Sequence, residues 1–348
     1  MVTVQRYSAR AVMRKLSTMW LPALCIAFSL PLAAASRKIV VAHRGASGYL
    51  PEHTLEAVAM AYAMGADFVE QDVVLSKDGV PVVLHDITLD AVTDVATRFP
   101  DRRREDGRYY ALDFSLSEIR QLRVTERFDR ATGQAVYPGR FPVRRAAFEV
   151  PTLEEELQLI QGLNSSTGKN VGVYPEIKAP AWHRQQGWDI SRIVLAVIGR
   201  YGYRTKDDNI YLQCFDFAEV KRIRRELGYQ GKLVQLVDGA GSFEQGRLTT
   251  RAGLEEAAAV VDALGPAIEQ VVTGPAKGVW QVSDLVRNAH AVGLEVHPFT
   301  VRADSLPPYA TSFEELLRIL LIEAGVDGVF TDHPDRAAAF LRSLRRTE

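Results

Sequence analysis

Cysteine is scarce in this chain of 348 residues, which contains only Cys25 and Cys214. A framework of several disulfides is therefore excluded, and the fold must rest on its hydrophobic core. With 47% hydrophobic residues, the chain is long enough to bury that core in one large domain or two small ones. The net charge is only −1, so the composition gives no indication of nucleic-acid binding.

An apolar run of membrane-spanning length is also missing. The most apolar stretch, residues 21–32, is interrupted by Pro22 and Pro31 and falls short of the roughly 20 residues that cross a bilayer. Four basic residues precede it and three alanines follow it, as in a cleaved signal peptide. We predict a signal peptide over residues 1–35, a periplasmic or secreted protein without a stable membrane anchor, and a mature chain over residues 36–348 with a net charge of −5.

Glycine-rich phosphate-binding loops are missing too. The segment after the first predicted strand, residues 43–48, lacks the glycine spacing of a dinucleotide-binding turn or a Walker loop. Internal repeats and low-complexity tracts are likewise absent from the sequence. We therefore expect neither a bound nucleotide nor a repeat architecture.

The sequence does contain a regular alternation of short apolar runs and amphipathic stretches. The apolar runs predict strands at residues 38–42, 68–74, 80–84, 171–176, 210–214, 233–237, 294–300 and 326–330. The amphipathic stretches predict helices at residues 54–64, 151–161, 217–227, 254–264, 282–291, 313–323 and 337–344. About eight such units favour an α/β fold, a distorted (β/α)8 TIM barrel, over an open doubly wound sheet.

One interval breaks this alternation. Residues from about 86 to 150 contain no clear strand–helix unit and include a charged run at 101–106. A connection of this length is usually functional or disordered, and its aromatic content favours order. We predict an inserted subdomain over the mouth at the C-terminal ends of the barrel strands.

Two carboxylates stand two residues apart on a predicted strand. Glu70 and Asp72 therefore point to the same face, where their charges repel unless a cation lies between them. Glu176, at the end of another predicted strand, can supply a third ligand. Each of these alone is more often a solvated strand residue, but all three at strand ends predict a metal site. An all-oxygen ligand set favours Ca²⁺ or Mg²⁺ over zinc.

Two histidines end strands near these carboxylates. His43 follows the strand at 38–42, and His85 follows the strand at 80–84. Residues 77–79, Lys-Asp-Gly, are a turn signal, and an antiparallel hairpin closed there would place His85 opposite Gln71. A parallel arrangement remains open. A lone histidine at a strand end is more often structural, but this pair beside a metal site indicates catalysis.

Phosphodiester cleavage needs one proton removed, one proton delivered and the charge of the phosphoryl oxygens compensated. Two histidines can divide the acid and base roles because imidazole titrates near neutral pH. Arg44 and Lys178 could hold the phosphate, Arg44 with two parallel donors. Each is more often a surface residue, but both lie beside other candidates in the sequence.

These residues lie in motifs that resemble the glycerophosphodiester phosphodiesterase family, in particular its secreted, periplasmic branch. The motifs are residues 43–54 (HRGASGYLPEHT), 70–72 (EQD), 83–86 (VLHD), 174–178 (YPEIK), 211–215 (YLQCF) and 328–332 (GVFTD). The resemblance implies a distorted (β/α)8 barrel with an inserted segment. It also implies a bound Ca²⁺, with Mg²⁺ as the alternative, and release of sn-glycerol 3-phosphate from glycerophosphodiesters.

The resemblance also assigns roles to individual residues. It implies an acid/base pair, His43 and His85; metal ligands Glu70, Asp72 and Glu176; and substrate contacts Arg44 and Lys178, with Glu52 orienting the site. The wider family usually has asparagine in place of His53 and tryptophan in place of His297, and we give neither a catalytic role. Asp86 and Gln213 are further candidates at the barrel mouth.

The sequence leaves three functions open. The leading one is a metal-dependent hydrolase acting on small glycerophosphodiesters. The second is a phospholipase-type enzyme that stops at a cyclic phosphate after attack by a neighbouring hydroxyl. The third is an exported binding protein without turnover, which would have no need for paired histidines beside a metal site. The order of proton transfer, the head group and the native metal stay open, and a homodimer is suggested only by the family likeness.

Overall fold

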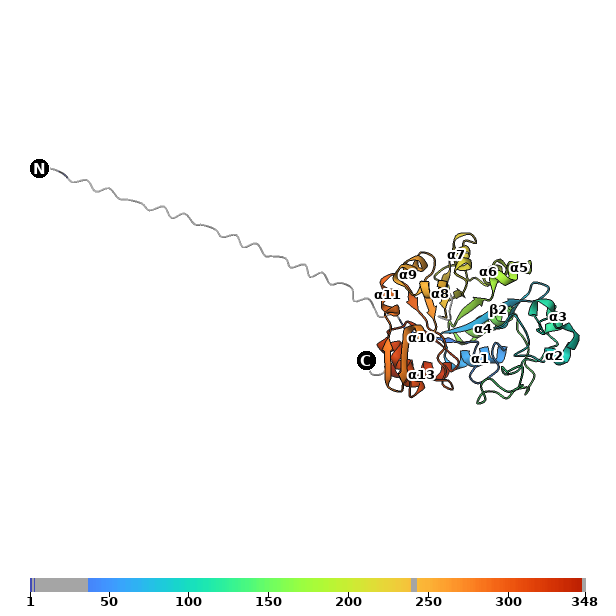
Figure 1. The fold of residues 1–348 in the computed structure, drawn as a ribbon. Coiled ribbons are helices and arrows are strands. Elements are labelled where there is room, and N and C mark those ends of the chain that lie inside the picture. The colour runs from blue at the N-terminus through green and yellow to red at the C-terminus, as the bar shows by residue number, and fades with distance from the viewer. Residues whose placement is uncertain (2, 4–36, 239–242, 346–348) are drawn as a thin grey trace. The chain divides into compact units, whose positions relative to one another are not determined.

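The computed structural model describes residues 1, 3, 37–238 and 243–345 of the chain (Figure 1). The predicted signal peptide, residues 1–35, therefore lies almost wholly outside the described residues. Residues 37–348 form one compact unit. Among the residues described, no helix combines the length and the apolar character that crossing a membrane requires.

Eight parallel strands build a barrel. They are β1 (Ile39–Ala42), β2 (Phe68–Leu75), β4 (Gly172–Ile177), β5 (Tyr211–Cys214), β6 (Lys232–Val237), β7 (Ala263–Pro266), β10 (Glu295–Val296) and β11 (Gly328–Thr331). Neighbours in the sheet follow the chain order, and β11 pairs with β1. The chain after β10 joins β11 through bonds from Val301 N to Phe330 O (2.8 Å) and from Phe330 N to Pro298 O (3.0 Å). The predicted TIM barrel is confirmed, and it is distorted where β10 is only two residues long.

Helices cover the outside of the barrel. The longer ones are α1 (Leu55–Met64), α4 (Leu153–Thr167), α6 (Ile190–Arg200), α7 (Phe217–Arg225), α9 (Arg251–Ala258), α11 (Leu285–Ala291) and α13 (Pro334–Leu344). The shorter ones are α5 (Pro180–Gln185), α8 (Phe243–Leu248), α10 (Ile268–Val271) and α12 (Phe313–Arg318), which continues into a π-helical turn (Ile319–Glu323). A separate hairpin consists of β8 (Val272–Ala276) and β9 (Val279–Val282).

Capping residues mark the ends of several helices. The Thr54 side chain accepts the amide hydrogen of Ala57 at the start of α1, and Gly65 ends that helix in the left-handed conformation. At the start of α4, Thr152 and Glu155 form a reciprocal capping box. The predicted starts of these two helices are therefore accurate to within about two residues.

The predicted number of barrel strands is correct, but one predicted strand lies outside the barrel and one barrel strand was not predicted. The predicted strand at residues 80–84 is β3 (Pro81–Val83), which lies antiparallel beside β2 and is no part of the closed barrel. The predicted helix at residues 254–264 is correct only as far as Ala258, where α9 ends, and its last two residues belong instead to β7, which begins at Ala263. A short apolar run cannot be assigned by periodicity alone, and β7 is fixed by pairing with β6.

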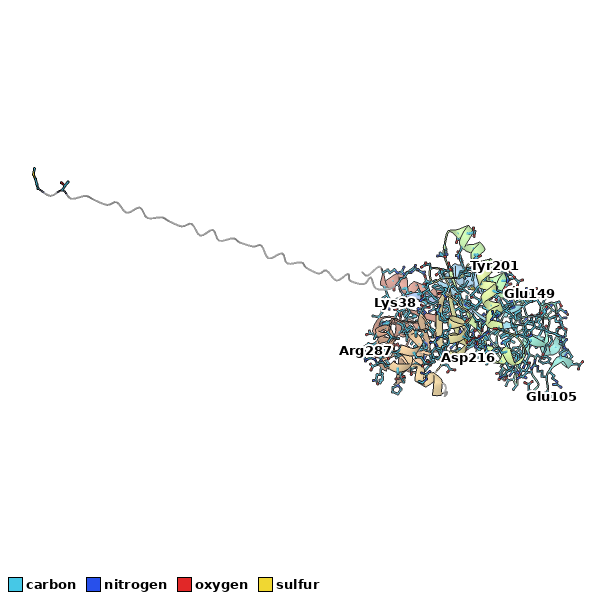
Figure 2. The ribbon with its side chains drawn as sticks, turned by 90° about the horizontal axis from the view of Figure 1, so that it is seen from above. Lys38, Glu105, Glu149, Tyr201, Asp216 and Arg287 are labelled. Carbon is cyan, nitrogen blue, oxygen red and sulfur yellow. The ribbon has the colours of Figure 1, made fainter. Side chains whose placement is uncertain are left out.

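The interval between β3 and α4 folds as an insertion with a hydrophobic cluster of its own. It contains α2 (Val95–Arg98), α3 (Leu116–Ile119) and two 3-10 turns (Pro100–Arg102 and Ala111–Asp113). Its cluster packs against Val74 and Val82 of the β2–β3 hairpin. Figures 1 and 2 place α2 and Glu105 on the side of the barrel opposite α11 and its Arg287. The insertion thus flanks the barrel, and it reaches the mouth through residues 126–140.

The barrel interior changes from apolar to polar along the strands. Near the strand starts, the rings of Phe68, Tyr174 and Phe330 pack together, with Tyr174 and Phe330 centroids 4.9 Å apart. One pleat further along β2 come Glu70 and then Asp72, on the same face as Phe68. The register pairs Asp72 with Glu176 across the β2–β4 ladder. The C-terminal ends of the strands therefore carry a polar site above an aromatic base.

Candidate active site

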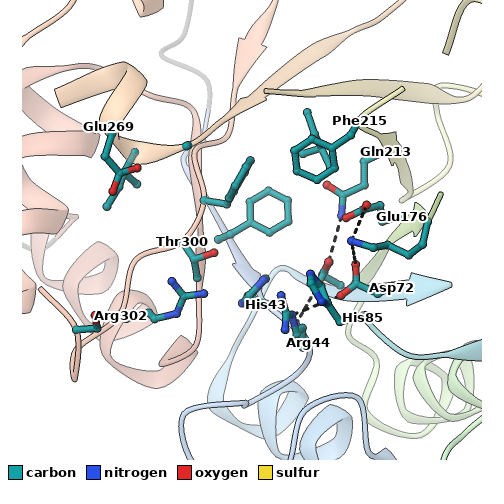
Figure 3. A pocket seen from close by; sticks show the side chains of 18 of the residues that line it. His43, Arg44, Asp72, His85, Glu176, Gln213, Phe215, Glu269, Thr300 and Arg302 are labelled. Carbon is teal, nitrogen blue, oxygen red and sulfur yellow. Dashed lines mark hydrogen bonds and ion pairs between the residues drawn. The ribbon is translucent and has the colours of Figure 1, made fainter. Parts of the chain in front are cut away.

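A cavity of about 380 Å³ opens at the C-terminal ends of the barrel strands (Figure 3). It is lined by seven of the eight predicted site residues: His43, Arg44, Glu70, Asp72, His85, Glu176 and Lys178. The eighth, Glu52, lines an adjoining cavity of about 200 Å³. Both cavities are bordered by His43, Arg44, His85 and Arg302. The two histidines thus stand at the junction of two chambers.

The three predicted metal ligands form a buried acidic group at this junction. Glu70, Asp72 and Glu176 are each at most 5% exposed. Burial, reinforced by the charge of Asp72, raises the pKa of Glu70 well above its usual range, and burial raises the pKa of Glu176 to about 8. Burial acts the same way on Asp72, but Lys178 holds the pKa of Asp72 well below its usual range. The three crowded carboxyl groups therefore differ in acidity, and Asp72, which Lys178 stabilises as the anion, is the strongest acid among them.

The donor atoms at this position fit a divalent cation. Ligand atoms of His53, Glu70 and Asp72 lie within 4.8 Å of one another. The buried Oδ1 atom of Asp72 accepts no hydrogen bond, although the Lys178 ammonium lies 3.4 Å away. Glu176 is not part of this group of three, and its Oε1 atom lies 2.9 Å from the Lys178 Nζ. Carboxylate oxygens are suitable ligands for Ca²⁺ or Mg²⁺, whereas the imidazole of His53 is a ligand more typical of transition metals.

His53 is a site residue to which the sequence analysis gave no role. Its Nε2 atom lies 2.8 Å from Asp72 Oδ2, and its buried Nδ1 atom has no hydrogen-bond partner. The backbone adopts the left-handed conformation here, with φ of 60°. The feature of the sequence that could have indicated a role for His53 is its position directly after Glu52. His297, by contrast, lies in the barrel interior, where its Nδ1 atom bonds the Tyr174 hydroxyl at 2.9 Å.

His43 is oriented by a carboxylate from the neighbouring strand. The Nδ1 atom of His43 lies 2.6 Å from Asp332 Oδ1, and the other Asp332 oxygen accepts bonds from Arg140 (2.6 Å) and Arg302 (2.8 Å). The β1–β11 pairing sets this geometry by placing Ala42 beside Thr331. Burial and then Arg44 lower the pKa of His43 to about 4. Asp332 belongs to the GVFTD motif, but its role was missed because only the closed barrel brings it to His43.

His85 is oriented by the residue that follows it. Its Nδ1 atom lies 2.7 Å from Asp86 Oδ1, and Arg127 of the insertion bonds Asp86 Oδ2 at 2.8 Å. The predicted antiparallel hairpin is confirmed, since Val73 pairs with Val83 and Leu84 N bonds Asp72 O. Burial and then Arg44 lower the pKa of His85 to about 4, although a third of its side chain is exposed.

Arg44 contacts acidic residues of both chambers. Its backbone N–H donates to Glu70 Oε2 (2.7 Å), and its guanidinium lies 3.1 Å from Glu52 and 3.4 Å from Asp72. Its φ of 58° is left-handed. The next position, Gly45, has no room for a side chain, because a Cβ there would lie 2.8 Å from the carbonyl carbon of Ala57. Glu52 also binds Arg127 at 2.6 Å, so it holds two arginines in place at the edge of the cavity.

Several apolar side chains also line the larger cavity. Phe215, Phe299 and Phe330 line it, with Leu236 and Ile268 beside them. Figure 3 shows the Phe215 ring next to Gln213, whose amide donates to Glu70 at 3.3 Å. The cavity is therefore lined by both ionic and aromatic side chains.

Both histidines have the same tautomer. Because Nδ1 of each faces a carboxylate, the proton resides on Nδ1 and the Nε2 atom carries the free lone pair. An imidazole in this tautomer can accept a proton and later return it. With Arg44 and Lys178 as fixed positive charges, the arrangement suits proton transfer around a bound phosphate.

Comparison with known proteins agrees with this chemistry. Residues 43–336 match the model of the glycerophosphoryl diester phosphodiesterase family. The chain belongs to this family. It is 44% identical to a glycerophosphodiester phosphodiesterase of Haemophilus influenzae, over 89% of this chain and 91% of that protein. It is 39% identical to one of Treponema pallidum, over 90% and 94%.

Solved structures of the family share the fold. A Silicibacter pomeroyi protein whose name assigns it to the same family matches with a TM-score of 0.67 and 26% identity, over 89% of this chain and 95% of its own. A phosphodiesterase of Oleispira antarctica, solved with the product sn-glycerol-3-phosphate, matches with a TM-score of 0.60 and 22% identity, over 88% and 97%. At that identity the second likeness concerns the fold alone.

Proposed function

We propose that this protein hydrolyses glycerophosphodiesters, the deacylated form of phospholipids, to sn-glycerol 3-phosphate and an alcohol. Family membership supports the reaction class. The observation that carries the proposal is the pair of aspartate-held imidazoles at the junction of two chambers, beside three buried carboxylates. A protein that only bound a diester would have no use for two proton acceptors there.

The substrate phosphate is proposed to lie at the junction. Arg44 lines the junction and Lys178 lines the larger chamber beside it. Both would contact the phosphoryl oxygens, and Glu52 would keep Arg44 oriented. His43 and His85 would divide removal of the nucleophile's proton and protonation of the leaving alkoxide. The two chambers give the two substituents of the phosphorus separate room, and the apolar wall excludes water on one side.

A divalent cation, Ca²⁺ or alternatively Mg²⁺, is part of the proposal. Glu70, Asp72 and Glu176 would hold it, and His53 lies close enough to contribute. When bound, the ion would compensate the negative charge that the phosphate brings to these carboxylates. The burial of the three carboxylates and the buried Asp72 Oδ1 atom that accepts no hydrogen bond support this assignment.

Product analysis of the purified mature protein tests the proposal. With glycerophosphocholine and Ca²⁺ we expect stoichiometric glycerol 3-phosphate, loss of activity in excess chelator and recovery when Ca²⁺ or Mg²⁺ is restored. Phosphorus NMR distinguishes the alternatives. A cyclic phosphate that persists would indicate the phospholipase-type reaction, and tight binding without any product would indicate a binding protein.

Export to the periplasm or beyond the cell is also proposed, from the signal-like segment at residues 1–35. Expression of the full chain followed by fractionation and N-terminal sequencing tests it. We expect the exported protein to begin at residue 36, and retention of the uncleaved chain in the cytoplasm would contradict export.

A further inference from the structure

The insertion contains a second cavity, larger than the catalytic one. Its volume is about 560 Å³, and all its lining residues fall between Asp90 and Ala146. None of them lines either chamber of the catalytic site. Small-molecule sites typically have volumes of about 300 to 1,000 Å³, so this cavity has the size of a ligand site.

The charge around this cavity is unbalanced. Four arginines, Arg103, Arg123, Arg130 and Arg144, line it, against Asp90 and Asp94. Asp90 is already bonded by Arg108 at 3.0 Å, and Arg130 lies 3.7 Å from it. The other three lining guanidinium groups have no carboxylate partner within 4.0 Å among the described residues, whereas most arginines of that part of the chain do. All four arginines are exposed, and an excess of positive over negative charge around one cavity favours the binding of an anion.

The segment that carries one of these arginines is strained. Arg144 and Ala146 both have φ of 59°, in the left-handed region that residues other than glycine rarely adopt. The Thr125 hydroxyl accepts the Arg144 amide hydrogen, and the Arg144 guanidinium lies 4.8 Å from the Phe128 ring centroid. Strained backbone of this kind gathers at ligand sites, where surrounding contacts impose it. The Arg144 side chain lines the cavity.

We propose that this cavity binds a phosphate ester. Arg103, Arg123 and Arg144 would bind the phosphate, because guanidinium groups match its oxygens with paired donors. The cavity exceeds the volume of a bare phosphate, and buried Tyr109 and Val124 offer an apolar surface to the organic part. The ligand is either a free phosphate ester, such as glycerol 3-phosphate, or the headgroup of an anionic phospholipid. This site is independent of the reaction proposed for the barrel.

Charge-matched variants separate this site from the catalytic one. Arg123→Gln combined with Arg144→Gln removes two lining charges. Arg145→Gln combined with Arg225→Gln removes two charges from exposed arginines that do not line the cavity. Calorimetric titration with glycerol 3-phosphate should show two sites per chain in the wild type and the control, and one in the cavity variant. Glycerophosphodiester hydrolysis should stay within about twofold in both.

Vesicle cosedimentation identifies the source of the phosphate. If a lipid headgroup is the ligand, wild-type protein binds phosphatidylglycerol vesicles at least tenfold more tightly than phosphatidylcholine vesicles, and the cavity variant loses this preference. If a free ester is the ligand, the second glycerol 3-phosphate site is present without vesicle binding. The proposal is overturned if the cavity variant and its control behave alike in both assays. Should the cavity variant melt more than a few degrees below its control, Arg103→Gln alone, at an exposed arginine, replaces it.

Discussion

His43 and His85 are held by the same chemistry in two different regions of the molecule. Each places Nδ1 on an aspartate, and each aspartate is bonded by arginine. The His43 side chain is 10% exposed and its aspartate comes from the far end of the chain, whereas His85 is 33% exposed and its aspartate is the next residue. The first pair is brought together by barrel closure and the second by a hairpin, and each aspartate is also bonded by an arginine of the insertion, Arg140 for Asp332 and Arg127 for Asp86.

The surroundings of the two aspartates indicate that His43 is held more rigidly than His85. Asp332 lies against strand β11, with two arginines on its free oxygen and 1% of its surface exposed. Asp86 lies in the loop after β3 and is fixed from outside by Arg127 alone. We therefore expect changes on the His43 side to reduce activity and stability together. Changes on the His85 side should mainly reduce activity.

The largest expected effect is loss of either imidazole. His43→Gln and His85→Gln should each lower kcat for glycerol 3-phosphate release about 10³-fold, within the range of general acid and base catalysis. His290→Gln, at a half-exposed histidine outside the two chambers, is the matched control and should retain activity. If one of the two variants keeps nearly full activity, that histidine has no acid or base role.

The pH dependence of stability should differ between the two histidines. Burial lowers the pKa of folded His43 from 6.5 to about 4, so the unfolded chain binds more protons between these values and stability falls as pH falls. From about pH 7 to 4.5 this one group should remove about 2.5 kcal/mol of unfolding free energy, a loss that His43→Gln lacks. His85→Gln should show a smaller difference, because water screens its exposed ring. Urea unfolding in the presence of chelator, at several pH values, measures the unfolding free energy of the wild type and of each variant. If the two substitutions change the pH dependence equally, the predicted difference between His43 and His85 is wrong.

The sequence predicted one of these two regions better than the other. The hairpin at residues 77–79 fixed the register that places His85 beside Asp72, because a turn signal and two flanking strands are local. Asp332 stood in a recognised motif, yet its contact with His43 depends on β1–β11 pairing across 289 residues, which no local pattern specifies. The predicted ligand set likewise omitted His53, whose position depends on a left-handed backbone turn.

Removing each aspartate's charge should have unequal effects. Asp332→Asn should lower kcat about 100-fold, because the amide no longer stabilises protonated His43 and leaves Arg140 and Arg302 short of an acceptor. Asp86→Asn should lower kcat about tenfold, since its site is more exposed. A shift in the pH profile of kcat with little change in KM would identify both as positioning residues. A larger fall in kcat for Asp86→Asn than for Asp332→Asn would contradict the prediction that Asp332 matters more.

The smallest expected effect comes from Arg127, the arginine that ties the insertion to the His85 side of the mouth. Arg127 bonds Glu52 at 2.6 Å and Asp86 at 2.8 Å, so Arg127→Gln should loosen His85 while leaving the His43–Asp332 pair in place. We expect kcat to fall about fivefold, near 1 kcal/mol, with the His43-dependent stability unchanged. Arg104→Gln is the matched control, because Arg104 makes a two-bonded pair with Asp113 in the insertion, outside both chambers. If both variants lose activity equally, the insertion acts through its overall stability. If only Arg127→Gln does, the contact of Arg127 with Asp86 transmits the insertion's position to His85.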